Sequence, residues 1–267
     1  MRVLLAQLAP VPGDLDANAA AAAAAIAADP DAELAVFPEL FLSGYDAASA
    51  GGLALAPDDA PLATVRAVAR RHATALLLGF VERLPGGGVA NAVACVERDG
   101  SLAAVYRKTH LFGAAEREVF AAGGELTVVE LAGRRIAPLI CFDVEFPEPA
   151  RALARAGAEL LVTLAANMEP YGPDHTLAAR ARALDNRLPH VYVNRVGQES
   201  GLTFTGGSLV AAPDGSLLAE LGADAATRAV DVLLGARADD DVDYLAHLRD
   251  GLPVKAVSSP SVQGGNR

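Results

Sequence analysis

Three separate segments of this sequence carry a reactive side chain at the end of an apolar run. Glu39 lies in "VFPELFLSGY", Lys108 in "VYRKTHLFG", and Cys141 in "RIAPLICFDVEFPE". Apolar surroundings raise the pKa of a carboxyl group, which suits a general base near neutral pH. A cysteine at the carboxyl end of a strand lies where sheet enzymes hold their reactive groups. These residue types would suit nucleophilic catalysis by a thiol with a carboxylate as its base.

Each of these residues also has a purely structural interpretation. Glu39 could point to solvent at the end of its strand, and Cys141 could be a small buried hydrophobe. The three acids that follow Cys141 disfavour a thiolate, so a reactive Cys141 needs a positive group from elsewhere in the chain. Arg107 or Lys108 could supply that charge, unless their segment is an ordinary basic loop.

Other residues that could take part in chemistry have weaker support from the pattern. Glu116 and Glu118 follow the lysine on what we expect to be a short turn, where a surface pair is the default interpretation. No histidine is placed beside Cys141 by the pattern, so a carboxylate is the better candidate for its base. Cys95 lies in the apolar run "NAVACVE", and we expect it to be a buried packing residue.

Short apolar runs alternate with helical patterns and turns along the chain. The runs predict strands over 3–9, 33–40, 75–82, 92–97, 103–108, 126–131, 135–142, 159–166, 190–197, 206–213 and 227–234. Helices are predicted over 14–28, 61–72, 147–157 and 175–187. Hairpin turns are predicted at "ERDGSL" and "APDGSL". Hairpins combined with strand–helix–strand units indicate a layered α/β or α+β domain.

Composition excludes several classes of protein and partner. The chain has 267 residues, of which 52% are hydrophobic and 21% charged, as expected for a globular protein. A formal net charge of −11 argues against nucleic acid and anionic membranes as main partners. Two cysteines are too few for a disulfide framework, and no targeting or membrane segment is convincing. We therefore expect a cytoplasmic protein with a loose tail at 258–267.

Three motifs, taken in order, resemble the nitrilase superfamily of carbon–nitrogen hydrolases: "FPELFLSGY", "YRKTHLFG" and "ICFDVEFPE". The resemblance extends over nearly the whole chain. It implies that Glu39, Lys108 and Cys141 are the catalytic triad and that Glu116 is the family's second glutamate. It also implies a single domain over 1–257, with the fold of a four-layer αββα sandwich of two mixed β-sheets covered by helices. Neither a metal nor an organic cofactor is implied, and the subunits are expected to form a homodimer or a higher homo-oligomer.

The resemblance further implies an amidase that acts on a small-molecule amide. Glu39 would take the thiol proton, Cys141 would attack the carbonyl, and Lys108 with the backbone N–H of Phe142 would stabilise the oxyanion. The run Cys141-Phe142-Asp143 and the absence of tryptophan favour the amidase branch over true nitrilases. Strand-like alternation predicts that the Phe142 side chain points away from Cys141. The acids at 143, 145 and 148 are expected to be mainly structural.

We expect five residues to bind substrate: Tyr45, Phe142, Asn167, Met168 and Glu169. Glu169 could face a cationic group, such as the amine of an amino-acid amide, or it could be a solvated loop residue. The chain could instead be an N-carbamoyl amino acid hydrolase, although its substrate would need a basic clamp that the sequence does not place. The sequence also leaves open acyl transfer by the same thioester and a catalytically silent binding scaffold. Residues 243–257 resemble the family's C-terminal segment only loosely.

Overall fold

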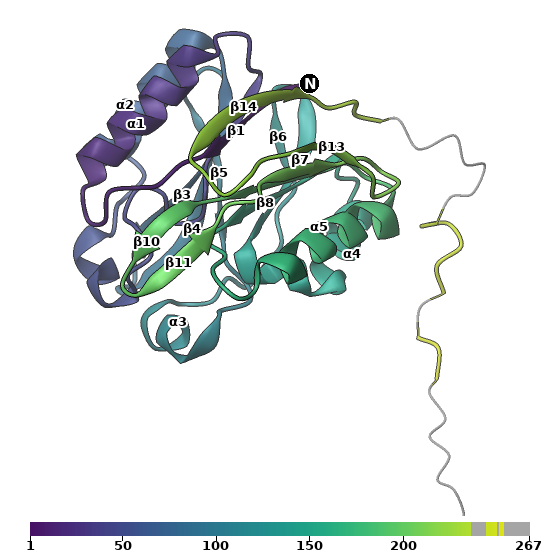
Figure 1. The fold of residues 1–267 in the computed structure, drawn as a ribbon. Helices are drawn as coiled ribbons and strands as arrows, with labels where there is room; N and C mark the ends of the chain where they lie inside the picture. The colour runs from purple at the N-terminus through teal and green to yellow at the C-terminus, as the bar shows by residue number, and fades with distance from the viewer. Residues whose placement is uncertain (236–243, 250, 254–267) are drawn as a thin grey trace, which may run out of the picture.

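Two six-stranded mixed β-sheets and the helices that cover them form this protein (Figure 1). The computed structural model describes residues 1–235, 244–249 and 251–253. The strands of the first sheet, in spatial order, are β14 (Ala226–Asp231), β1 (Arg2–Gln7), β2 (Leu34–Val36), β3 (Ala75–Arg83), β4 (Val89–Val96) and β5 (Leu102–Arg107). Those of the second are β13 (Leu217–Glu220), β12 (Leu209–Ala211), β9 (His190–Asn194), β8 (Leu160–Ala165), β7 (Arg134–Ile140) and β6 (Val129–Leu131).

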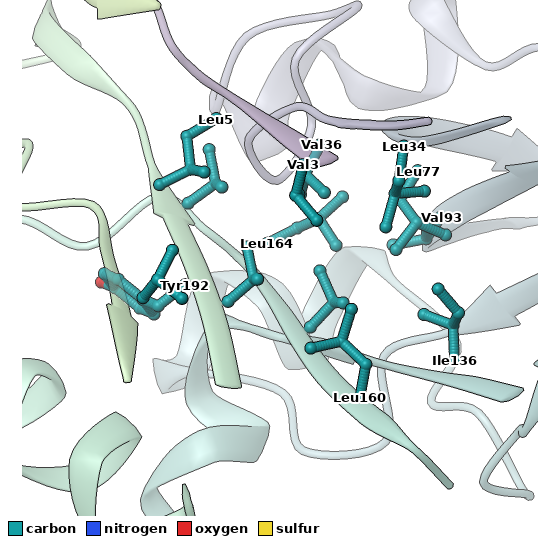
Figure 2. Close-up of a cluster of buried hydrophobic side chains, with 14 of the residues drawn as sticks. Val3, Leu5, Leu34, Val36, Leu77, Val93, Ile136, Leu160, Leu164 and Tyr192 are labelled. Atoms are coloured by element: carbon teal, nitrogen blue, oxygen red, sulfur yellow. The ribbon is translucent and has the colours of Figure 1, made fainter. Parts of the chain in front are cut away.

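Alternating side chains on the strands explain why the sheets stack face to face. Along β1, Val3 and Leu5 pack into the core between the sheets, whereas Leu4 and Ala6 pack against helices. Figure 2 shows Leu5, Val36 and Leu77 on one side of this core and Leu160 and Leu164 on the other. Since both faces of these strands are apolar, each sheet needs a cover of helices on its outer face.

The helices lie on opposite outer faces of the two sheets (Figure 1). On the first sheet these are α1 (Leu15–Ala28) and α2 (Ala60–His72), and on the second α4 (Pro147–Arg155) and α5 (Gly172–Asn186). The layer order is therefore α–β–β–α, as the family resemblance implied. A short helix, α3 (Gly113–Val119), two 3₁₀ helices, η1 (Ala47–Leu53) and η2 (Cys141–Glu145), and a small hairpin of β10 (Val196–Glu199) and β11 (Leu202–Thr205) complete the described elements.

Strand directions bring separate segments of the chain to one edge of the sandwich. β2 runs parallel to β3, β3 antiparallel to β4, and β4 antiparallel to β5, so β2 and β5 point the same way. The segments that follow these two strands hold Glu39 and Lys108. In the second sheet β7 runs parallel to β8, and the segments that follow them hold Cys141 and Asn167. Carboxyl ends of parallel strands are the usual place for a site in such folds.

The structure corrects three local expectations. The strand predicted over 33–40 ends at Val36, and the chain turns through Leu40 with a φ of 49°. Glu116 and Glu118 belong to helix α3 rather than to a short turn. Phe142 does not follow strand alternation, because the strand ends at Ile140 and a 3₁₀ turn starts at Cys141.

Several features lie outside what the structure describes. The predicted domain end at 257 and the tail over 258–267 fall beyond the described residues. The segment 243–257 is described only at 244–249 and 251–253. Within the described part of the chain, no helix has the length and apolar character needed to cross a membrane.

Candidate active site

A buried cluster of charged side chains joins three of the predicted residues. The ammonium of Lys108 donates from Nζ to Oε1 of Glu39 at 2.7 Å and to Oε1 of Glu116 at 2.9 Å. The three side chains are at most 5% exposed. Two carboxylates thus share one ammonium group in a site that is closed to bulk water.

Polar groups from both sheets hold the Glu39 carboxylate in place. Oε1 also accepts from Nδ2 of Asn91 on β4 at 2.7 Å, and Oε2 accepts from the backbone N–H of Ala166 at 2.9 Å. Burial raises the pKa of Glu39, whereas the charge of Lys108 opposes that shift. A carboxyl group with a raised pKa can both accept and return a proton near neutral pH.

The second carboxylate fixes the lysine from the other side. Glu116 sits on α3, where its Oε1 also accepts from the Tyr45 hydroxyl at 2.7 Å and its Oε2 from the Phe112 N–H at 2.8 Å. Burial alone would lower the pKa of Lys108, but the charges of Glu39 and Glu116 raise it above its ordinary value. Lys108 is therefore a fixed cation at neutral pH.

Cys141 is the first residue of η2, directly after β7, and adopts a left-handed backbone conformation. Its φ is 45°, which is uncommon for a residue other than glycine and carries local strain. Burial raises the pKa of the thiol well above its ordinary value, and the charge of Glu39 adds to this effect. Lys108 and the Ala166 N–H act in the opposite direction. The thiol is therefore protonated at rest and needs a base before it can attack.

Asp143 ties the turn that holds Cys141 to the segment that holds Lys108. Its Oδ2 accepts from the Ile140 N–H at 3.0 Å and from the Tyr106 hydroxyl at 2.7 Å. Its Oδ1 accepts from the Thr109 hydroxyl at 2.8 Å and the His110 N–H at 2.9 Å. This buried carboxylate is structural, in agreement with the expectation from the sequence.

A very small pocket, with a cavity volume of about 10 Å³, opens beside Cys141. The described residues that line it are Tyr45, Phe112, Cys141, Phe142, Glu145, Asn167, Met168, Tyr171 and His175. Phe142 therefore lines the same pocket as Cys141, contrary to the alternation argument. The ring of Phe112 packs edge-on against Phe142 and Tyr171, with centroids 5.3 and 5.9 Å away. This volume is close to that needed by a single water and far below that of sites for drug-sized ligands, so the pocket suits only a small group.

Two polar residues of this pocket were not expected from the sequence. The local pattern puts His175 at a helix end with no role, and Glu145 among the structural acids. Nε2 of His175 lies 3.1 Å from Oε1 of Glu145, and Nδ1 lies 3.0 Å from the Tyr192 hydroxyl. Burial lowers the pKa of His175 to about 4, so its ring is neutral at pH 7. Only contacts between residues far apart in sequence reveal this pair, and no local pattern marks it.

Asn91 is a further residue that the sequence interpretation missed. It lies inside the buried strand β4, and its Nδ2 reaches the same oxygen of Glu39 as Lys108 does. An amide inside the apolar run "VANAVACV" is a signal that could have found it, since buried polar groups need partners.

The remaining predicted substrate-binding residues divide between two neighbouring pockets. Asn167 and Met168 line the Cys141 pocket, and Asn167 is held by Asn194, whose Oδ1 accepts from its N–H at 2.8 Å. Glu169 is exposed and instead lines an adjoining pocket with a cavity volume of about 570 Å³. The two pockets share four lining residues: Tyr45, Phe112, Met168 and Tyr171.

No group of three or more histidine, cysteine, aspartate or glutamate side chains is arranged to hold a metal ion in the described ranges. The expectation that the reaction needs no metal and no organic cofactor stays a prediction.

Comparison with known proteins places this arrangement in a family. Residues 2–238 match the family model of the carbon-nitrogen hydrolases. An (R)-stereoselective amidase from a Pseudomonas species is 41% identical over 258 residues, which cover 93% of this chain and 92% of that protein. The "Hydrolase in pqqF 5′ region" of Pseudomonas protegens is 42% identical over 229 residues, or 85% of this chain and 80% of that protein.

A solved structure agrees with this match. A mutant of the amidase from Nesterenkonia sp. AN1, with acrylamide added at its active-site cysteine, superposes with a TM-score of 0.81 and 32% identity. The superposition covers 93% of this chain and 96% of that one. Since the family model spans most of the sequence and these relatives share its length and fold, the chain belongs to the carbon-nitrogen hydrolase family.

Proposed function

We propose that this enzyme hydrolyses the C–N bond of a small amide through a thioester at Cys141, with Glu39 as base and acid and Lys108 as the oxyanion partner. The observation that carries the proposal is the buried cluster of Lys108 with two carboxylates, beside a thiol whose pKa responds to Glu39 and Lys108. The amidases from Pseudomonas and Nesterenkonia support the choice of an amide as substrate.

The first half of the reaction forms the thioester. Glu39 takes the proton of the Cys141 thiol, and the thiolate sulfur attacks the amide carbonyl carbon. Negative charge moves to the carbonyl oxygen, where the Lys108 ammonium and the Phe142 N–H stabilise it. When the tetrahedral intermediate collapses, the C–N bond breaks, and Glu39 gives its proton to the departing nitrogen as ammonia or an amine leaves.

The second half releases the acid. Glu39 takes a proton from a water molecule, whose oxygen attacks the thioester carbon. The C–S bond then breaks, the carboxylic acid leaves, and the sulfur regains a proton from Glu39. Glu116 takes no proton in this scheme; it holds Lys108 and, through Tyr45, one wall of the pocket.

Ammonia release from a panel of neutral amides, aminoamides, N-carbamoyl amino acids and nitriles tests the proposal. We expect release from amides by the wild type and none by Cys141→Ala. Cys95→Ala is the matched control, because Cys95 is fully buried in β4 and its pKa is raised by burial to about 12. Release that persists in Cys141→Ala would overturn the thiol mechanism.

Two outcomes would favour a different function. Hydroxamate formation on adding hydroxylamine, without ammonia release in its absence, would favour acyl transfer. If iodoacetamide labelled neither Cys141 nor Cys95 in a folded wild type that released no ammonia, a silent scaffold would be the better explanation.

The assembly and the location of the protein are separate proposals. A homodimer or higher homo-oligomer and a cytoplasmic location both stay predictions from the sequence and from the family resemblance. Sedimentation of the purified full chain would test the first.

A further inference from the structure

The pocket beside Cys141 carries a carboxylate that the proposed reaction does not use. Glu145 is the last residue of η2, four residues after Cys141, and lines the same pocket. Both residues belong to the same short 3₁₀ turn, Cys141–Glu145, so their side chains reach the pocket from one segment of the chain. A ligand that contacts both side chains therefore spans only a few bonds.

The hydrogen bonds of His175 fix both the position and the charge of Glu145. A carboxylate can only accept, so the proton of the neutral imidazole lies on Nε2, which donates to Oε1 of Glu145. Nδ1 then accepts from the Tyr192 hydroxyl. His175 thus orients the carboxylate without neutralising it, and the Glu145 side chain remains 34% exposed.

In the described part of the chain, no cationic side chain lines the pocket together with Glu145, since its lining residues include no lysine or arginine. Lys108 is already held by Glu39 and Glu116. Burial and the charge of Asp174 both raise the pKa of Glu145, which indicates that this region disfavours a further negative charge. A cationic ligand group would stabilise the ionised Glu145 carboxylate and so oppose this rise in its pKa, whereas an anionic group would raise the pKa further.

We infer that Glu145 is a specificity residue, whose carboxylate binds the ammonium group of amides that carry a protonated amine one or two carbons from the carbonyl. This inference rests on the proposed amide hydrolysis at Cys141 and names the substrate class of that site. The aromatic wall of Phe112, Phe142 and Tyr171 would contact the remaining carbon atoms of such a substrate. Substrates with a carboxylate at this position, such as N-carbamoyl amino acids, would meet Glu145 and be rejected.

The role that the sequence suggested for Glu169 thus passes to Glu145. Glu169 is exposed and lines the larger pocket, whereas Glu145 shares the small pocket with the nucleophile. Since an ion pair is stronger where water is partly excluded, the half-buried carboxylate is the better ammonium partner.

Two pairs of nearly isosteric amides test the inference. 3-Aminopropanamide is compared with butanamide, and alaninamide with 2-methylpropanamide, so that each pair differs by an ammonium in place of a methyl group. We expect a higher kcat/KM for the cationic member of at least one pair. Glu145→Gln keeps an acceptor for His175 but removes the charge. It should lower kcat/KM for the cationic member about 10- to 100-fold, the size expected for a lost charge-assisted hydrogen bond.

Controls separate a lost ion pair from a general defect. The ratio of kcat/KM within each pair makes the separation: a general defect in Glu145→Gln lowers both members alike and leaves the ratio unchanged, whereas loss of the ion pair lowers the ratio of cationic to neutral member. Glu148→Gln, an exposed substitution of the same type three residues away, should leave both pairs unchanged.

The outcomes distinguish this inference from the proposed function. Hydrolysis of both members without a preference, or a preference that survives Glu145→Gln, would overturn the role of Glu145 and leave amide hydrolysis standing. A preference lost in Glu169→Gln but not in Glu145→Gln would assign the ammonium to the larger pocket. If the wild type cleaved neither member of either pair while Cys141 stayed inert, the proposed function would fail as well.

Discussion

At the scale of single residues, Lys108 is a buried charge whose stability depends on its carboxylate partners. Its side chain is fully buried, and its ammonium is shared by two carboxylates. Removing one partner of such a cluster leaves uncompensated charge, which costs about 3–5 kcal/mol of stability unless a carboxylate takes up a proton. The same ammonium is the proposed donor to the oxyanion, so stability and catalysis depend on one group.

We therefore predict that Lys108→Met lowers both activity and stability. The loss of an oxyanion donor should reduce kcat about 100- to 1000-fold. The free energy of unfolding in urea should fall by about 3 kcal/mol or more at pH 7. Initial rates with the best amide and equilibrium unfolding measure the two effects. A Lys108→Met enzyme with wild-type kcat would remove Lys108 from the mechanism, whatever its stability.

The site residues that the sequence predicted are those whose chemical type is unusual in its local context. Glu39, Lys108 and Cys141 each interrupt or end an apolar run, and the structure brings the first two into direct contact. Glu145 and His175 could not be paired in advance, because 30 residues separate them and each looks ordinary locally. The sequence does show Asn91 as an amide inside an apolar run. Its partner Glu39 is 52 residues away, so the local pattern could not identify the contact.

At the scale of elements, one glycine determines how closely the turn that holds Glu39 approaches its neighbouring strand. Gly79 lies in the middle of β3, and a Cβ atom there would stand 2.3 Å from the Pro38 carbonyl oxygen and 2.5 Å from the Leu40 nitrogen. Both contacts are with backbone, which cannot move aside as a flexible side chain would. Glycine inside a strand often marks such a close approach.

We predict that Gly79→Ala destabilises the protein and displaces Glu39. Overpacking should lower the free energy of unfolding by roughly 1–3 kcal/mol, and kcat should fall as Glu39 moves away from Lys108. Gly52→Ala is the control, since a Cβ atom there meets nothing within 4 Å. Urea unfolding and initial rates would be measured for both. Equal effects of the two substitutions would contradict this account of Gly79.

Helices and strands with a clear pattern of apolar residues were predictable from the sequence. Those whose position depends on tertiary contacts were not. The central strands and four long helices follow from apolar runs and from proline or capping residues. Strand β2 ends early because the chain must turn to place Glu39. Helix α3 has only seven residues, too few for a periodic pattern, and its place is set by Glu116 contacts with Lys108 and Tyr45.

At the scale of the whole molecule, the site exists only while the two sheets are stacked. Glu39 and Lys108 follow strands of the first sheet, whereas Cys141 and Ala166 follow strands of the second. The Ala166 N–H contacts Glu39 across this boundary. Any condition that loosens the sandwich should therefore separate the base from the nucleophile, and activity should fall together with global stability.

Acid is such a condition, because two histidines are buried as neutral rings. Burial lowers the pKa of both His175 and His190 to about 4, from an ordinary value of 6.5. The unfolded chain then binds more protons than the folded one below pH 6.5, so stability decreases as the pH falls toward 4. Between pH 7.5 and pH 5 each histidine should remove about 2 kcal/mol from the free energy of unfolding.

His190→Gln isolates one of these contributions. His190 lies fully buried between the Thr163 hydroxyl and the Ala179 carbonyl, at 2.8 and 2.9 Å, away from the pocket. The substitution should reduce the loss of stability between pH 7.5 and pH 5 by about 2 kcal/mol, whatever it does to stability at pH 7.5. The raised pKa of Glu39 has the opposite effect on the free energy of unfolding, which it increases as the pH falls. This contribution is the same in the wild type and in His190→Gln, so it cancels in the comparison. Urea unfolding at the two pH values gives the four free energies required. An unchanged pH dependence in His190→Gln would show that this buried imidazole does not couple protonation to folding.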